Sequence, residues 1–255
     1  MLRSMYSGIS GMKGFQTKLD VVGNNIANVN TSGYKKGRIT FQDLMSQTSS
    51  PAQGSGGNRG GINPIQVGTG STIGSIDNIH TQGFRQTTDR TLDVMIEGDG
   101  FFTLEMPDGS EAYTRAGNFS LDDEGRLVNA NGYYVKGVNG QIPENAKEIS
   151  IEKDGTVHYL DTNGEQQTAG TIEINAFANA GGLSKSGENL WLETNNSGTP
   201  EVVNSDIVSG ALEMSNVDLS EEFTEMITAQ RGFQANTRII TTSDEILQEL
   251  VNLKR

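Results

Sequence analysis

Apolar residues recur at alternating steps of three and four at both ends of the chain, a spacing that predicts one amphipathic helix at each end. The stripe within residues 1–30 consists of Leu2, Met5, Ile9, Met12, Leu19 and Ile26. The stripe within residues 212–255 consists of Phe223, Met226, Phe233, Ile240, Leu247 and Val251. We expect these stripes to act as assembly seams, which pack against each other or against copies of the chain in neighbouring subunits.

The two predicted helices differ in their local signals. Four glycines fall within the first helix: Gly8, Gly11, Gly14 and Gly23. Each costs about 1 kcal/mol relative to alanine, so something outside this helix must stabilise it. The second helix is better marked, because Asn216 or Asp218 can cap its start and Lys254 and Arg255 can close its end.

The middle of the chain has a different period. Dipeptides of Asp, Asn or Glu followed by Gly recur from Asp99 to Gly164 and separate short runs of strand-forming residues. Such dipeptides favour tight hairpins, so we expect an antiparallel β domain over residues 73–211. Residues 31–72 include a stretch rich in Ser, Gly, Gln and Asn that indicates an extended connector. The expected fold class is therefore α+β, with terminal helices at 1–30 and 212–255.

Composition narrows the range of functions. The chain of 255 residues has a net charge of −13, which disfavours nucleic acid and anionic lipid as partners. It contains no cysteine, which excludes disulfides and thiolate metal sites. No stretch is apolar enough for a membrane span, and residues 1–30 lack the pattern of a cleavable signal peptide. If the protein leaves the cell, we expect it to use another route.

Motifs for catalysis or cofactor binding are missing from the sequence. There is no phosphate-binding loop, and the glycines of residues 54–59 do not match the dinucleotide fingerprint. Asp122 and Asp123 fall in an expected hairpin turn, where we interpret them as solvated. We therefore expect no catalytic, cofactor-binding or metal-binding residues.

Four motifs nevertheless resemble those of one known family. Residues 19–36 (LDVVGNNIANVNTSGYKK) resemble its N-terminal signature, which includes Asn24, Asn25, Ala27, Asn28 and Gly33. Residues 112–119 (AYTRAGNF) are similar to its β-domain motif. The sequences LEMSNVDL at 212–219 and AQRGFQAN at 229–236 resemble the entry to its terminal helix and the helix itself. The family that they resemble is the flagellar rod and hook axial proteins, and the motifs occur in its order along essentially the whole chain.

The resemblance implies a structural subunit that self-assembles helically into a tube, without enzymatic activity or a cofactor. The terminal helices would pair as a coiled coil around a central channel, with the β domain outside, and the tube would transmit motor torque. The implied partners are copies of the same chain, adjacent rod proteins, the hook cap, the hook–filament junction proteins and the flagellar type III export apparatus. Phe41 and Met45 resemble an export-recognition element, although an ordinary buried phenylalanine is an equal alternative.

Within this family, residues 1–12 and 246–253 look like those of the short hook proteins of Gram-positive bacteria, whereas the length and the long connector resemble the distal rod protein. The hook is the preferred interpretation at this point, and the distal rod is the alternative. Two other classes stay open: a carbohydrate-binding or cell-wall-active β protein, which would need two convergent carboxylates, and a secreted adhesin.

Overall fold

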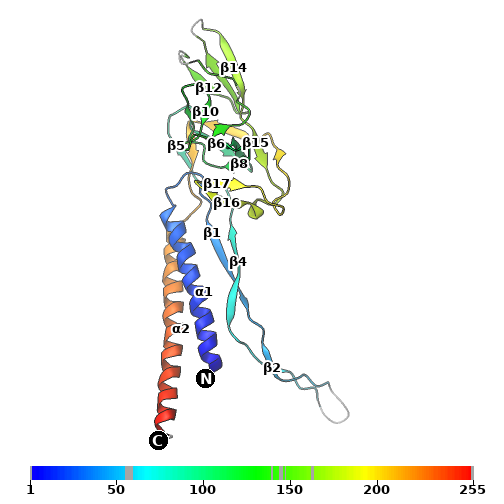
Figure 1. Cartoon of the computed structure of the whole chain (residues 1–255), viewed down its shortest axis with the longest axis vertical. Helices are drawn as coiled ribbons and strands as arrows, with labels where there is room; N and C mark the ends of the chain where they lie inside the picture. Colours follow the sequence, from blue (N-terminus) through cyan, green and yellow to red (C-terminus); the bar gives the residue numbers. More distant parts are fainter. Residues whose placement is uncertain are drawn as a thin grey trace. The chain divides into compact units, whose positions relative to one another are not determined.

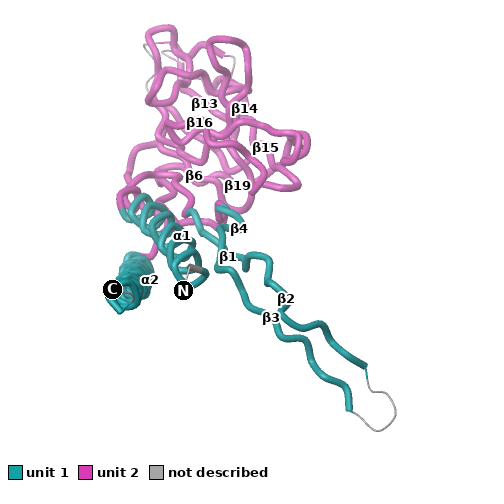
Figure 2. Tube along the Cα trace, turned by 60° about the horizontal axis from the view of Figure 1, so that its bottom comes forward, with its two compact units in different colours: residues 1–26, 37–77, 219–255 teal, residues 27–36, 78–218 magenta. Residues whose placement is uncertain are grey.

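The computed structural model describes residues 2–54, 60–138, 140–143, 146, 148–161 and 164–253, with the side chain of Leu2 left out. The expected closing residues Lys254 and Arg255 lie outside this range. The chain forms two compact units, coloured separately in Figure 2. Unit 1 comprises residues 1–26, 37–77 and 219–255, and unit 2 comprises residues 27–36 and 78–218.

Unit 1 contains both helices, which run antiparallel so that their free ends lie together (Figure 1). Helix α1 spans Leu2–Ala27 and α2 spans Leu219–Leu253. Helix α1 ends in a turn in which the Thr31 N–H donates to the Asn28 carbonyl oxygen at 3.1 Å. Helix α2 carries Glu221 and Glu222 in its first turn, where the helix dipole favours negative charge.

Unit 1 also contains a ribbon of strands that the sequence did not reveal. Strand β1 (Gly37–Asp43) pairs with β4 (Ser71–Asn78), and β2 (Gln47–Ser50) pairs with β3 (Ile65–Val67). These strands occupy much of the segment that we expected to be an extended connector. All of β3 and most of β2 are exposed. Backbone hydrogen bonds form this part of the ribbon, and no alternation of apolar residues in the sequence predicts it.

Unit 2 is an antiparallel β structure. Its strands are β5 (Arg85–Thr87), β6 (Val94–Glu97), β7 (Phe101–Glu105), β8 (Glu111–Thr114), β9 (Ser120–Leu121), β10 (Leu127–Val128), β11 (Tyr134–Val135), β12 (Ile149–Ile151), β13 (Thr156–Leu160), β14 (Gln166–Thr171), β15 (Ile174–Ala176), β16 (Ser184–Gly187), β17 (Leu190–Leu192), β18 (Glu201–Val202), β19 (Asp206–Ser209) and β20 (Ala211–Glu213). The main sheet has the order β16-β17-β8-β7-β11-β10-β9. Strand β15 also pairs with β7, and β18 pairs with β15. The α+β class is confirmed, with helices at both ends and an antiparallel β region between them.

The core of unit 2 lies where the strands face one another. Phe102 and Phe119 are fully buried and meet edge to face, with ring centroids 5.2 Å apart. The Gly-containing dipeptides connect several consecutive strands, as expected of hairpins. Gly109 between β7 and β8 has a φ of 76°, and Gly125 between β9 and β10 has a φ of 75°. Glycine reaches this left-handed region without the strain of a side chain. In the part of the chain described, no helix is long and apolar enough to cross a membrane.

Candidate assembly site

The two helices of unit 1 approach each other closely because glycine stands where they cross. A Cβ atom placed on Gly8 would lie 3.2 Å from Cγ1 of Ile240 in α2. A Cβ atom on Gly232 of α2 would lie 2.6 Å from Cζ of Phe15 in α1. Each glycine therefore accepts a large side chain of the opposite helix. Of the four glycines that weaken α1 in isolation, Gly8 and Gly11 face α2 and let it pack closely.

Small and polar residues of α2 are buried, and one ion pair joins the two helices. Ala229 is fully buried, and Ser243 is buried with its hydroxyl donating to the Ile239 carbonyl oxygen at 2.7 Å. Lys18 of α1 forms an ion pair with Glu225 of α2. The search for apolar periodicity does not find these residues, because it counts large apolar side chains. The closest contacts here are made at residues with small side chains or none.

The structure places the predicted seam residues in three groups. Half-buried positions on the two helices are Met5, Met12, Leu19, Ile26, Met226, Phe233, Ile240 and Leu247. Exposed positions are Ile9, Phe223 and Val251. The side chain of Leu2 lies outside the description. Helix α2 has 35 residues and α1 has 26, so the last turns of α2 extend past the start of α1 and Val251 has no part of α1 beside it.

The packing of α1 against α2 predicts that a larger side chain at position 232 opens the pair. Gly232→Leu should raise the intrinsic helix propensity of α2 by about 1 kcal/mol. It should nevertheless weaken the pairing by about 1–3 kcal/mol, because Phe15 occupies the space that the leucine needs. Urea denaturation followed by circular dichroism measures the net loss. The exposed Ala235→Leu is the matched control, and an equal stability of both variants would contradict this packing.

Asn25 of the signature joins three elements of unit 1. Its side-chain amide donates to the Gly37 carbonyl oxygen at 2.9 Å and to Oε2 of Glu222 at 3.2 Å, and its Oδ1 accepts from the Gly37 N–H at 3.0 Å. Asn25 is buried, so these bonds replace the water that its amide would otherwise bind. The end of α1, the start of β1 and the first turn of α2 are thereby held together.

The other signature residues lie around the end of α1. Asn28 accepts at Oδ1 from the Thr31 hydroxyl at 3.1 Å. Gly33 has a φ of 70°, and a Cβ atom there would lie 2.5 Å from the backbone nitrogen of Ala116, so no other residue fits. Asn24 and Ala27 are exposed at the last turns of α1.

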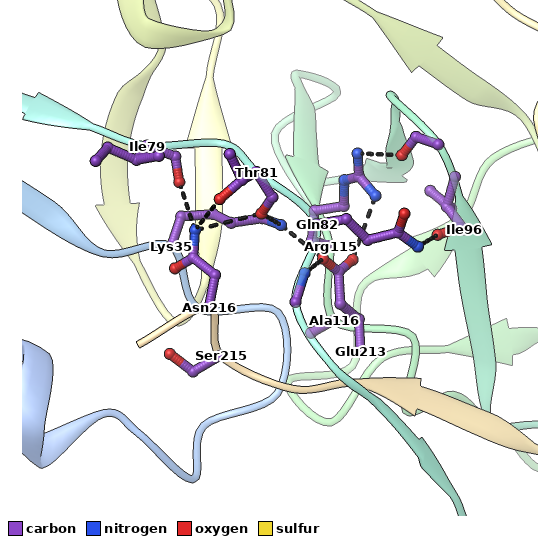
Figure 3. A network of polar contacts seen from close by, with 12 residues as sticks. Lys35, Ile79, Thr81, Gln82, Ile96, Arg115, Ala116, Glu213, Ser215 and Asn216 are labelled. Carbon is purple, nitrogen blue, oxygen red and sulfur yellow. Dashed lines mark hydrogen bonds and ion pairs between the residues drawn. The ribbon is translucent and has the colours of Figure 1, made fainter. Parts of the chain in front are cut away.

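Unit 2 holds a buried charge cluster of Lys35, Arg115 and Glu213 (Figure 3). The Lys35 Nζ lies 2.6 Å from Oε1 of Glu213, and Nη1 of Arg115 lies 3.2 Å from Oε2. Glu213 Oε1 also accepts from the Gly83 N–H at 2.8 Å. Residues from three distant parts of the chain thus converge on one carboxylate.

Further bonds join residues 35–36, 79–81 and 216. Lys35 also donates to the Thr81 carbonyl oxygen at 2.8 Å. The Asn216 side chain accepts from the Lys36 N–H at 2.8 Å. It also donates to the Ile79 carbonyl oxygen at 2.8 Å (Figure 3). Burial lowers the pKa of Lys35, and the neighbouring Glu213 carboxylate opposes that shift. The cluster and these bonds hold three segments of unit 2 together.

His80 lies beside this cluster as a half-buried ring. It packs edge to face on Trp191, with centroids 4.8 Å apart, and neither ring nitrogen has a hydrogen-bond partner among the described residues. Burial, with smaller contributions from Lys35, Arg115 and Lys185, lowers its pKa to about 4.

This environment of His80 predicts an acid-dependent loss of stability. The unfolded chain binds a proton at its ordinary pKa of 6.5, whereas the folded chain does so only at about 4. Protonation of His80 therefore does not lower the free energy of unfolding above pH 6.5. As the pH falls from 6.5 toward 4, that free energy decreases by about 1–3 kcal/mol for a half-buried ring. Free energies of unfolding measured at several pH values should show a shallower decline for His80→Phe than for the parent. If the free energy of unfolding declines equally with falling pH in both proteins, His80 is not the group that causes the acid-dependent loss.

Phe41 and Met45, the expected export element, have different surroundings within unit 1. The Phe41 ring packs against α1, with its centroid 6.0 Å from that of Phe15 and with Cε1 2.8 Å from a Cβ placed on Gly14. Met45 is 88% exposed. Phe41 therefore has a packing role in the folded unit whether or not the export apparatus reads it.

The structure thus pairs the terminal helices through glycine-lined contacts within unit 1, and unit 2 is an antiparallel β structure. Three family descriptions match the chain: "Flagella basal body rod protein" over residues 5–35, "Flagellar hook protein FlgE/F/G D1 domain" over 95–159 and "Flagellar basal body rod FlgEFG protein C-terminal" over 208–253.

Individual relatives extend this match to the full chain. The sequence is 57% identical to the flagellar basal-body rod protein FlgG of Bacillus subtilis and 41% identical to that of Borreliella burgdorferi, covering 100% of both chains in each case. It is 30% identical to the flagellar hook protein FlgE of Borreliella burgdorferi over an alignment of 443 residues. The chain belongs to the flagellar rod and hook protein family, whose members are structural subunits of the bacterial flagellum.

Proposed function

We propose that this chain is a subunit of the distal rod, the alternative to the hook in the sequence interpretation. The observation that carries the proposal is the 57% identity to a basal-body rod protein over the full length of both chains. The alignment with a hook protein needs 443 positions for the 255 residues of this chain, so that relative contains long additional segments. The matching chain length and the higher sequence identity both favour the rod protein over the hook protein.

In this role the chain polymerises helically through α1 and α2 and transmits torque along the tube. An exposed apolar stripe on α2 supports the proposal, because it has no partner in the described part of unit 1. The stripe consists of Ile239, Ile246, Leu250 and Leu253. A tube built from copies of the chain would cover this surface. Adjacent rod proteins and the hook would be the neighbours at the two ends of the segment, and the hook cap and hook–filament junction proteins would lie farther along.

Labelling of isolated hook–basal bodies distinguishes rod from hook. An epitope inserted at the Asp108-Gly109 turn of unit 2, which is exposed, should leave the fold intact. Antibody bound to gold should then mark the segment between the motor rings and the hook. Label along the curved hook would contradict the rod assignment and would restore the hook interpretation.

Export is proposed to follow the flagellar type III route, without a cleavable signal peptide. If Phe41 belongs to the recognised element, Phe41→Ala should lower the amount of the protein outside the cytoplasm several-fold. The loss of packing on Gly14 should cost the folded unit only about 1–2 kcal/mol, because Phe41 is 42% exposed. Immunoblots of cell and export fractions measure the effect. Ile39→Ala, a nearby half-buried position of β1, is the control, and normal export of Phe41→Ala would remove the idea.

A further inference from the structure

A groove lies on unit 1 along the face of α1 that points away from α2. It has a volume of about 440 Å³, and its lining includes Arg3, Tyr6, Ile9 and Lys13 of α1, with Leu44 across from them. Tyr6 is 70% exposed, so a large aromatic surface is open in the single chain. Arg3 and Lys13 make no ion pair with the described residues of the chain. The groove is therefore apolar at its centre and positively charged at both ends.

The helix α2 of the same chain cannot fill this groove. Gly8 faces Ile240 of α2, and at 100° per residue Tyr6 points about 160° away from Gly8 around the helix. The groove is instead bordered by the chain segment around Leu44 and Thr69. Its occupant must come from elsewhere.

The end of α2 has the complementary chemistry. Leu250 is 49% exposed and Leu253 is 83% exposed, and both belong to the part of α2 that extends past α1. Glu245 and Glu249 are exposed, lie four residues apart and border the same stripe. This helix end offers an apolar ridge flanked by two carboxylates.

We propose that the groove of one copy binds the projecting end of α2 of a neighbouring copy. This inference rests on the proposed function and names the contact between subunits. Leucine side chains of the neighbour would cover Tyr6 and Ile9, and its Glu245 and Glu249 would face Arg3 and Lys13. Groove and ridge are different surfaces, so the contact is heterologous and repeats into a ring or an open helix without closing a dimer.

Charge reversal tests the contact with the full-length chain. One variant carries Arg3→Glu and Lys13→Glu, and the other carries Glu245→Lys and Glu249→Lys. Either variant alone places like charges in every contact, so the protein concentration needed for sedimenting assemblies should rise about tenfold at low salt. In an equimolar mixture, each reversed groove can bind a reversed ridge, and assembly should return to the concentration that the parent requires. The inference is overturned if the parent assembles and either variant alone assembles equally well, or if mixing restores nothing.

A cysteine experiment provides an independent readout, because the natural chain contains no cysteine. Chains with Tyr6→Cys are mixed with chains with Leu250→Cys, assembled and mildly oxidised, and a species of twice the chain mass is expected. Thr241→Cys replaces Leu250→Cys in the control, because Thr241 is exposed about 180° around α2 from Leu250. Equal crosslinking in the control, or none with Leu250→Cys in assembled material, would overturn the contact. A parent chain that fails to sediment at any concentration would instead overturn the proposed function, and the contact with it.

Discussion

Replacing Glu213 by glutamine should destabilise unit 2 by about 3–5 kcal/mol, the cost of leaving buried charges without their counterion. Lys35 and Arg115 are buried on either side of this carboxylate, at 2.6 and 3.2 Å. Glutamine keeps the shape and one acceptor oxygen, so the loss measures charge and not packing. Two cations would then share the site, where Asp99 would still favour their charged forms.

Thermal unfolding monitored through Trp191, a buried residue of unit 2, measures this effect. The midpoint should fall by about 10 °C or more. Glu201→Gln in β18 is the control, because Glu201 is exposed and its replacement should change the midpoint by no more than about 2 °C. Equal midpoints for the two variants would show that the cluster does not hold unit 2 together.

Replacing Ile240 by aspartate should separate α1 from α2. Ile240 is half-buried and packs on Gly8. A Cβ atom placed on Gly8 would lie only 3.2 Å from Cγ1 of Ile240. A carboxylate at this position would lose water without gaining a partner, at a cost of about 2 kcal/mol or more. Unit 2 does not contain this residue, so its thermal transition should stay where it is in the parent. Limited proteolysis should cut α1 faster in the variant.

The helices and the hairpins follow from sequence patterns because their signals are local. The spacing of Met226, Phe233 and Ile240 shows which side of α2 is half-buried, since the helical period relates these residues directly. The turn at Asp108-Gly109 is predictable for a similar reason, because glycine supplies the positive φ of the hairpin.

The closest contacts were not predictable because they depend on residues far apart in sequence. Nothing near Glu213 indicates that Lys35 and Arg115 will surround it, since the partners are separated by 178 and 98 positions. The face of α2 at Ala229 and Gly232 was missed because their small side chains carry little apolar weight. The pairing of β2 with β3 was missed because both strands are mostly exposed.

The central claim is that the paired terminal helices form the assembly core of a helical polymer. The direct measurement is sedimentation and electron microscopy of the parent, Ile240→Asp and Thr241→Asp at equal concentration. Thr241 is exposed beside the seam, so aspartate there changes the charge without entering the contact. The account predicts tubes from the parent and from Thr241→Asp, and none from Ile240→Asp, because the defect recurs in every subunit. Tubes of parental length from Ile240→Asp would contradict the assignment of these helices to the core.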